Sequence, residues 1–418
     1  MVPGLLNHAN VLARGGHWAD AAKVYDHLVK LQPGFLSYEQ GLERALAAVR
    51  RQGGGCIPQV SLAPGAPAHA LETRTLEVLL RHGLVGPEAV SAYQRPPVMG
   101  PDLGLLTVTA ALRAGTAPAA AAGWARALDA WLARWGGCRL EPSGEARFSA
   151  IRLRALGAGA DGGPKVTVAM SCFNNAETVE AAALSVLGQT HRNLELVIVD
   201  DASTDASRAA LAALAAQDPR IRVLFNTKNQ GTYANRNRVW AQSDAEFFCC
   251  LDADDIALPG RLAHQCHLLQ AQPHALGVVS SWVRMTADGL PVYQNQGAGG
   301  FVHHAVSTMM LRREPVLKSL GYWDAVRFEA DSEFMCRLQA VHGKQALLWD
   351  NTVTALALSR AGSLTQDPAT GLDDIFGPSP MRQQYREAWR AWHASGAQLY
   401  LGLQPQPRPF AAPPEMLP

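Results

Sequence analysis

The chain has 418 residues, which is enough for two or three domains and a sizeable core. Its formal net charge is +1, and 17% of its residues are charged, so no overall field recruits nucleic acid or an anionic membrane. The seven cysteines include no Cys-x-x-Cys pair, which favours reduced thiols over a disulfide framework or a zinc site. The sequence shows neither a signal peptide nor an apolar run of about 18 residues, and we therefore expect a cytoplasmic protein.

Residues 1–52 are expected to form a helical hairpin, because apolar residues recur there every three or four positions. A glycine at the turn, an alanine at the helix contact and a proline at the exit resemble a tetratricopeptide repeat. Only one such repeat is present, and a solenoid needs about three to bury its faces. We interpret the hairpin as a structural cap, with a binding module for a protein partner as the alternative. The matching positions are Gly16, Ala21, Tyr25, Leu28 and Pro33.

Two further regions flank the centre of the chain. Residues 69–156 have helical periodicity and show no pattern that carries chemistry. In the C-terminal part, 371–418, a helix over Met381–Ala394 carries three aromatic residues at helical spacing. This helix should pack on a neighbouring domain, although its arginines also suit peripheral association with a membrane surface. The proline-rich end, 405–418, is expected to be an extended tail.

Between residues 165 and 370 strand-like and helical segments alternate, which predicts an α/β domain with a mostly parallel sheet. The strands are near-continuous apolar runs, as strands covered by helices on both faces should be. A later β-rich run predicts another strand over Gly277–Thr286. The first four expected strands are Val166–Cys172, Leu194–Val199, Ile221–Phe225 and Phe247–Leu251, and the helices between them are Ala176–Gln189, Ser203–Ala216 and Thr232–Ala241.

Polar side chains follow each of these four strands. Ligands of open α/β sheets bind beyond the carboxyl ends of the strands, so this edge is the predicted site. No Gly-x-Gly-x-x-Gly turn follows the first strand, which argues against a dinucleotide-binding domain and against a P-loop. The strand-end residues are Asn174, Asn175, Asp200, Asp201, Asn226, Asp252, Asp254 and Asp255.

Asp252 and Asp254 stand two residues apart at the end of the fourth strand. In an extended segment they would point to the same side, roughly 6–7 Å apart. Two carboxylates this close raise each other's pKa unless a cation lies between them. Mg²⁺ or Mn²⁺ suits such oxygen ligands. The alternative is a solvated acidic turn without a function.

Several motifs, in order and spacing, resemble the family 2 glycosyltransferases of the GT-A fold. The resemblance covers about residues 165–365, half of the chain. Two departures are Met170, where the family usually has proline, and Phe173, where it has tyrosine. The motifs are Ser171–Asn175, Leu184–Thr190, Leu196–Asp205, Asn229–Gly231, Ala234–Asn237 and Leu251–Asp255.

The resemblance implies a nucleotide-diphosphate sugar as the donor, with a UDP-sugar expected first. Asp252 and Asp254 correspond to the family's Asp-x-Asp motif, with Asp254 contacting Mg²⁺ or Mn²⁺ and Asp255 supporting it. Arg337 is expected either to serve a phosphate or to pair with a neighbouring acid. The other residues implied to contact the donor are Ser171, Asn174, Glu177, Asp200, Asp201, Asn229, Gly231, Arg236, Arg360 and Ser363.

The family commonly has a Glu-Asp pair opening a helix, with an arginine six residues beyond the aspartate. Asp331 and Arg337 have this spacing, but an alanine replaces the first acid. Asp331 is therefore the expected general base for the acceptor hydroxyl, with Glu329 and Glu333 as alternatives. A purely structural alternative is that Asp331 caps its helix.

His303 and His304 are adjacent on an expected strand, so at most one of them faces the site, and a core histidine is favoured over a ligand. We thus expect an inverting glycosyltransferase that moves a sugar to a hydroxyl of a glycan or lipid-linked acceptor. The analogy extends to surface polysaccharide synthesis (capsule or lipopolysaccharide), in the cytoplasm or peripherally at the inner face of the membrane.

Two alternatives stay open. A metal-dependent nucleotidyltransferase usually needs a glycine-rich first turn, and none is present. A non-catalytic GT-A-like scaffold or adaptor is disfavoured because Asp252, Asp254 and Asp331 are all intact.

Overall fold

The computed structural model describes residues 101–113, 117–159, 161–292, 301–360, 370–373, 377–403 and 407–418, together with short stretches between residues 9 and 48. Residues 53–68 and the first part of the expected 69–156 region lie outside the described residues, as does Ser363. The N-terminal stretches include helix α2 (Trp18–Leu31), whose Tyr25 and Leu28 are buried. Gly16 and Pro33, which mark the ends of the expected repeat, are not described, so the tetratricopeptide resemblance stays a prediction.

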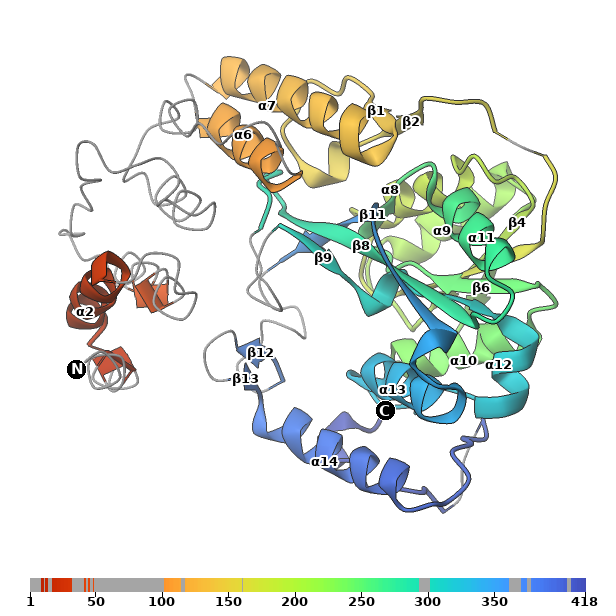
Figure 1. Cartoon of the computed structure of the whole chain (residues 1–418). Helices are drawn as coiled ribbons and strands as arrows, with labels where there is room; N and C mark the ends of the chain where they lie inside the picture. The colour runs from red at the N-terminus through yellow and green to blue at the C-terminus, as the bar shows by residue number, and fades with distance from the viewer. Residues whose placement is uncertain are drawn as a thin grey trace.

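A nine-stranded mixed sheet forms the centre of the described structure (Figure 1). Its strand order is β5-β4-β3-β6-β10-β8-β11-β7, and β9 pairs with β8. The ladders joining β5, β4, β3 and β6 are parallel, as is the ladder between β8 and β11; the other ladders are antiparallel. The strands are β3 (Val166–Cys172), β4 (Leu194–Asp200), β5 (Ile221–Phe225), β6 (Phe247–Cys250), β7 (Asp255–Ala257), β8 (Gly277–Thr286), β9 (Val302–His304), β10 (Met310–Arg312) and β11 (Leu347–Ser359).

Helices cover both faces of this sheet, because successive strand residues point to opposite sides. Leu196 and Ile198 of β4 belong to an apolar cluster under α8, α9 and α11, whereas Val197 and Val199 belong to a second cluster under α10, α12, α13 and α14. The predicted α/β domain is confirmed. The helices are α8 (Val179–Leu187), α9 (Ser207–Gln217), α10 (Thr232–Gln242), α11 (Arg261–Ala271), α12 (Arg313–Leu320), α13 (Ala330–His342) and α14 (Pro380–Ala394).

One helix boundary differs from the expectation. Ser203 was expected to cap the second crossover helix, but α9 begins at Ser207 with Ala206 at the N-cap. The Ser203 hydroxyl instead accepts a hydrogen bond from the backbone N–H of Asn174, at 3.1 Å. The serine therefore ties together the loops that follow β3 and β4, at the predicted binding edge.

The helices before the sheet are part of its core. Leu105 of α6 (Pro101–Arg113) and Leu128 of α7 (Ala117–Trp131) share an apolar cluster with Val283 of β8 and Leu356 of β11. The sequence suggested a helical region ending at 156 and a separate domain beginning at 165. In the structure one apolar cluster includes residues from both sides of this boundary. The remaining short elements are η2 (Leu132–Gly136), β1 (Cys138–Leu140), η3 (Phe148–Ala150), β2 (Leu153–Ala155), η4 (Val306–Thr308), η5 (Lys344–Ala346), β12 (Leu372–Asp373), β13 (Gly377–Pro378) and η6 (Pro414–Met416).

Trp124 fixes α7 to the turn after β8, and this contact makes a stability prediction. The buried indole donates a hydrogen bond to the carbonyl of Gly289 at 2.7 Å. Gly289 has φ +79°, and an added Cβ would lie 2.7 Å from the Trp124 ring. We expect Gly289→Ala to destabilise the protein by about 1–3 kcal/mol, because backbone strain and overpacking add.

The matched control is Gly144→Ala, since Gly144 has φ +75° but open space around its Cβ position. Denaturant unfolding of both variants separates the backbone cost from the Trp124 contact. An equal loss of stability in the two variants would mean that the indole gives way at no cost.

The C-terminal segment is packed, not extended. Tyr385, Trp389 and Trp392 of α14 are buried in the second cluster, which confirms that this helix packs on the domain. Phe410 and Met416 are buried too, and the Phe410 ring stacks on Trp392 with 5.1 Å between centroids. The expectation of an extended tail over 405–418 is therefore wrong for the described residues 407–418, because its few apolar side chains are enough to anchor it.

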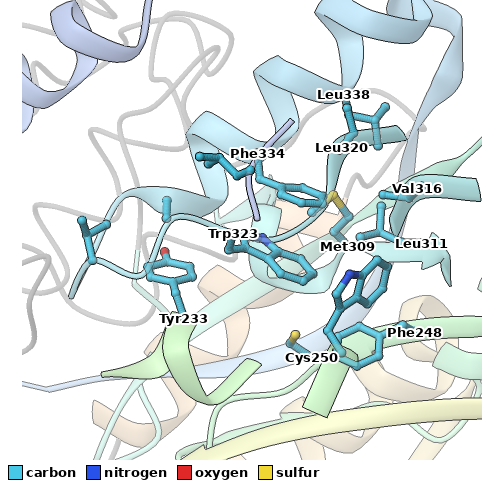
Figure 2. Close-up of a cluster of buried hydrophobic side chains, with 14 of the residues drawn as sticks. Tyr233, Phe248, Cys250, Met309, Leu311, Val316, Leu320, Trp323, Phe334 and Leu338 are labelled. Atoms are coloured by element: carbon cyan, nitrogen blue, oxygen red, sulfur yellow. The ribbon is translucent and has the colours of Figure 1, made fainter. Parts of the chain in front are cut away.

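Beneath the N-terminal end of α13, aromatic rings fill the second cluster (Figure 2). Phe334 stacks on Trp323 with 4.2 Å between centroids, and Trp240 meets Phe248 edge-on at 4.7 Å. Such pairs contribute packing energy and a defined orientation. Asp331 is thus carried by a helix with a rigid base. No described helix is long and apolar enough to cross a membrane.

Candidate active site

A pocket of about 680 Å³ lies at the carboxyl ends of β3, β4 and β6. The predicted strand ends do converge there, because parallel strands place these ends at one edge of the sheet. The last residues of β11 and the middle of β8 close the opposite side. The lining residues are Ser171, Cys172, Phe173, Asn175, Asp201, Asn229, Gly231, Thr232, Asp252, Ala253, Asp254, Asp255, Trp282, Arg284, Arg327, Leu358 and Arg360.

Asp201 organises one wall of the pocket. Its carboxylate accepts hydrogen bonds from the backbone N–H groups of Gln230 and Gly231, at 2.9 and 2.8 Å, and from the Asn226 amide at 2.7 Å. Asn229 donates to the Asp201 carbonyl at 3.3 Å. Gly231 has φ +83°, a conformation that favours glycine. The carboxylate therefore shapes the Asn229–Gly231 loop as well as lining the pocket.

Asp200 does not line the pocket. Its side chain is fully buried, and the Arg208 Nε lies 3.0 Å from its Oδ2. Of the two aspartates for which donor contact was expected, the structure brings only Asp201 to the pocket.

The loop after β3 reaches the pocket through a different set of residues from the one expected. Ser171 lines the pocket, but the Asn174 side chain accepts from the Thr204 N–H at 2.9 Å, and Glu177 is exposed outside the lining. Phe173 and Asn175 line the wall in their place. Asn174, with φ +54°, turns the chain so that its neighbours face inward.

The three carboxylates after β6 have three different environments. Asp252 is paired with Arg236, with 3.0 Å between Nη2 and Oδ1, and its side chain is 41% exposed. Asp254 is 20% exposed and lies 3.3 Å from Arg360. Asp255 is buried and accepts a hydrogen bond from the Leu358 N–H at 3.1 Å. Only the first two are presented to a ligand, and Asp255 braces the turn against β11.

Burial and, next, the Asp252 carboxylate raise the pKa of Asp254 above its usual value. Burial together with Asp254 and Asp252 raises the pKa of Asp255 well above its usual value. The turn therefore concentrates negative charge that a cation would relieve. Within the described part of the chain, no three His, Cys, Asp or Glu side chains gather into a complete metal site. Asp252 and Asp254 fit a hard divalent cation that takes its remaining ligands from phosphate and water.

Asp331 is not among the residues that line this pocket, but its charge acts on Arg236, the partner of Asp252. Tyr233 lies close to Asp331: burial and, next, the Asp331 charge raise the pKa of the Tyr233 hydroxyl well above its usual value. The buried Arg236 guanidinium lies within the electrostatic reach of both Asp252 and Asp331. The structure thus brings Asp331 to the carboxylate turn from a segment about 80 positions further along the chain.

The two alternatives to Asp331 are committed to packing. Buried Glu329 is ion-paired with Arg382 and Arg386 of α14. Fully buried Glu333 lies 2.9 Å from His393 of α14 and 3.0 Å from Arg337. Both carboxylates attach the C-terminal helix to α13, and neither lines the pocket.

Arg337 is likewise structural. Its side chain is fully buried, pairs with Glu333, and donates to the carbonyls of Leu320 and Tyr322 at 2.8 and 2.7 Å. The structure therefore corrects its expected phosphate contact: of the two roles considered, the guanidinium pairs with a neighbouring acid.

The Glu329 ion pairs make a second stability prediction. Glu329→Ala would leave Arg382, whose side chain is 5% exposed, without its carboxylate. Breaking a buried pair in this way costs about 3–5 kcal/mol, and thermal unfolding measures it. The control is Glu387→Ala on the exposed face of α14, which should change stability by no more than about 0.5 kcal/mol. Equal effects of the two substitutions would contradict the role of Glu329 in attaching α14.

Among the lining residues that were not expected, Trp282, Arg284 and Arg327 add an indole and two positive charges. Trp282 and Arg284 stand two apart on β8 and line the same wall of the pocket. Alternate residues of a strand share a face, so this spacing could have indicated them from the sequence. Arg327 donates to the Asn229 side chain at 3.0 Å and to the Leu417 carbonyl at 3.3 Å. The packed C-terminus thereby supports the pocket rim.

The two histidines of β9 separate as expected for adjacent strand residues. His303 is the cross-strand partner of Trp282, and His304 meets the ring of Trp349 at 5.2 Å. Neither lines the carboxylate pocket.

The fold and its carboxylate-lined pocket define a GT-A-type domain. A sequence model of glycosyl transferase family 2 matches residues 167–321, from β3 to the end of α12, which confirms the family resemblance of this domain.

Relatives of known name match about a quarter of the chain. The putative glycosyltransferase EpsE of Bacillus subtilis is 34% identical over 113 residues, which are 27% of this chain and 41% of the relative. The succinoglycan biosynthesis protein ExoO of Rhizobium meliloti is 36% identical over 99 residues, 24% of this chain and 28% of the relative. An Escherichia coli UDP-Glc:alpha-D-GlcNAc-diphosphoundecaprenol beta-1,3-glucosyltransferase, WfgD, is 34% identical over 104 residues, 25% of this chain and 40% of the relative. The chain thus spans less than half the length of these relatives.

Among solved structures, S. aureus TarS 1–349 in complex with UDP-GlcNAc is similar at 18% identity and a TM-score of 0.39, over 48% of this chain and 60% of that chain.

Proposed function

We propose that this protein is a glycosyltransferase that moves a sugar from a nucleotide-diphosphate sugar to a hydroxyl of a glycan or lipid-linked acceptor. The observation that carries the proposal is the convergence of Asp201, Asp252 and Asp254 on one pocket, with Asp331 adjoining through Tyr233. The family match and the polysaccharide-synthesis relatives support a role in surface polysaccharide assembly. Peripheral attachment at the inner face of the membrane fits a lipid-linked acceptor.

The early strand ends suit the nucleoside. Phe173 is 45% exposed on the pocket wall and offers a ring on which a base can stack. Asn175 and Asp201 supply polar atoms for the base edge and ribose hydroxyls. A UDP-sugar is the proposed donor, because the relative WfgD is a UDP-Glc glucosyltransferase.

The diphosphate belongs between the carboxylate turn and Arg360. Asp252 and Asp254 would hold Mg²⁺ or Mn²⁺ there, and the cation would neutralise the charge on the leaving nucleotide. Arg360, Arg284 and Arg327 line the same pocket and supply fixed positive charge. Asp254 is freed for the cation when the exposed Arg360 turns to a phosphate.

Asp331 is the proposed general base. The acceptor hydroxyl gives its proton to the Asp331 carboxylate while its oxygen attacks the anomeric carbon and the nucleotide diphosphate departs. Such direct displacement inverts the anomeric centre. Tyr233 belongs to the buried cluster drawn in Figure 2 and lies within electrostatic reach of Asp331. Its hydroxyl is proposed to help orient Asp331 for this step.

A panel of nucleotide sugars, incubated with the protein and Mn²⁺ and assayed for released nucleotide, tests the proposal. We expect slow hydrolysis of one donor class without an acceptor. Thermal shifts with UDP, GDP and CDP, each with and without Mn²⁺, identify the base. Failure of every nucleotide to bind would favour a scaffold, whereas nucleotidyl transfer to a sugar phosphate would favour a nucleotidyltransferase.

A further inference from the structure

A second depression, of about 640 Å³, lies at the opposite end of β11 from the donor pocket. Residues 348–353 at the start of the strand line it, whereas Leu358 at the end of the strand lines the donor pocket. The eight steps along the chain from Asp350 to Leu358 correspond to roughly 25 Å of extended strand. The depression is therefore a separate feature, and no step of the proposed transfer uses it.

Two backbone irregularities meet at this depression. The end of α7 widens into a π-helical turn, Leu132–Gly136, which places Arg134 and Trp135 on the wall. The ladder between β11 and β8 shifts register between Trp349 and Val353, so the intervening residues bulge out of the sheet. π-helical turns and β-bulges both occur preferentially at functional sites, where they redirect side chains.

The irregular segments present two indoles to solvent. Trp349 is 47% exposed, and its ring packs edge-on against His304, with 5.2 Å between centroids. Trp135 packs on the apolar cluster of α7 while lining the depression, and the Arg134 guanidinium lies 5.2 Å from its ring centroid. Tryptophan is enriched at binding interfaces, where one side of the indole is apolar and the other is wet.

The polar groups beside the indoles are fixed. Asp350 accepts hydrogen bonds from Ser280 at 3.0 Å and Thr352 at 3.0 Å, and His264 lies 2.9 Å away. Gln272 and Asn351 add planar amides to the wall. The charged lining consists of one guanidinium, Arg134, and one carboxylate, Asp350, so the site is close to neutral.

We propose that this depression is a carbohydrate-binding site for a neutral glycan segment. The C–H face of a pyranose ring packs on an indole, and its hydroxyls need planar amide, carboxylate and guanidinium partners held in place. Pockets of this size, apolar on one side with a few fixed polar groups, take small organic ligands. The balanced charge disfavours phosphorylated or polyanionic ligands. The proposal stands on the depression alone and does not require transferase activity.

The test is binding of the full chain to cello-, malto-, laminari- and chito-oligosaccharides, measured by calorimetry and by retardation in gels containing the corresponding neutral polysaccharides. We expect at least one to bind with a dissociation constant of about 1 mM or tighter. Trp349→Ala should weaken that binding at least tenfold, and Trp349→Phe should restore part of it. The matched control is Tyr400→Ala, which removes an aromatic side chain that is 40% exposed elsewhere.

Asp254→Asn, in the donor pocket, should leave glycan binding unchanged. Failure of the glycan proposal can therefore be told apart from failure of the donor-site proposal. Absence of binding to every oligosaccharide overturns the proposal, as does binding that survives Trp349→Ala. A Trp349-dependent dimer without glycan binding would also overturn it and assign the indole to a protein interface. The Trp349 indole is half exposed, so Trp349→Ala should remain folded, and thermal unfolding checks this.

Discussion

Asp331→Asn is expected to lower the rate of sugar transfer by about 10²–10⁴-fold while leaving donor affinity within about twofold. The amide keeps the size and shape of the side chain, but it cannot take a proton from the acceptor. In the proposed site the donor would be bound by a different set of groups, on the loop after β4 and the turn after β6, which line the pocket. Steady-state transfer kinetics and UDP titration of the same preparation measure the two effects separately.

Ser332→Ala is the matched control, because it changes the next residue of α13 without altering a charge. Its transfer rate should stay close to that of the unchanged protein. If Asp331→Asn retained its turnover, the general base could not be a residue of α13 or its N-cap. Glu329 and Glu333 cannot replace it, since their carboxylates are held by Arg382, Arg386, Arg337 and His393.

The first half of the sheet was predictable because local pattern decides it. Near-continuous apolar runs such as Val166–Cys172 form parallel strands with the predicted bounds, and their polar ends meet at one edge. The antiparallel half was less accessible. β10 has three residues and β7 begins at Asp255, inside a motif expected to be only a metal turn. Such short strands exist because neighbouring strands pair with them, and pairing across the chain leaves no local signal.

The candidate site shows the same division. Asp201, Asp252 and Asp254 reach the pocket because strand ends place them there. The spacing alone could not assign a role to Arg337. An arginine on a helix can pair with an acid one turn away, here Glu333, or reach a phosphate outside the helix. Its complete burial shows that it pairs with Glu333. Glu329 has φ +74°. Its partner Arg382, on the C-terminal helix, lies 53 residues further along the chain. The sequence predicts the helix and its packing on the domain, but the partner of its arginines is set by the folded chain and leaves no local signal.

Asp254→Asn is the second substitution with a large expected effect. We expect Mn²⁺-dependent affinity for UDP to fall on the order of a hundredfold, because one of the two exposed carboxylates proposed to hold the cation is lost. The apo protein should be as stable as the unchanged protein at neutral pH, or more stable. Burial and Asp252 raise the pKa of Asp254, so its charged form is disfavoured in the folded state, and that penalty grows as pH rises through the raised pKa. Calorimetric titration with UDP, with and without Mn²⁺, and apo thermal unfolding provide the two measurements.

Opposite effects on binding and on stability are what distinguish a ligand-binding carboxylate from a structural one. Asp244→Asn is the control: this aspartate pairs with Lys165 and is 76% exposed, so neither UDP affinity nor its Mn²⁺ dependence should change. If Asp254→Asn lowers stability and leaves Mn²⁺-dependent binding intact, its carboxylate serves mainly to hold Arg360. The cation would then have to be bound elsewhere, or the diphosphate charge would be balanced by the arginines that line the pocket.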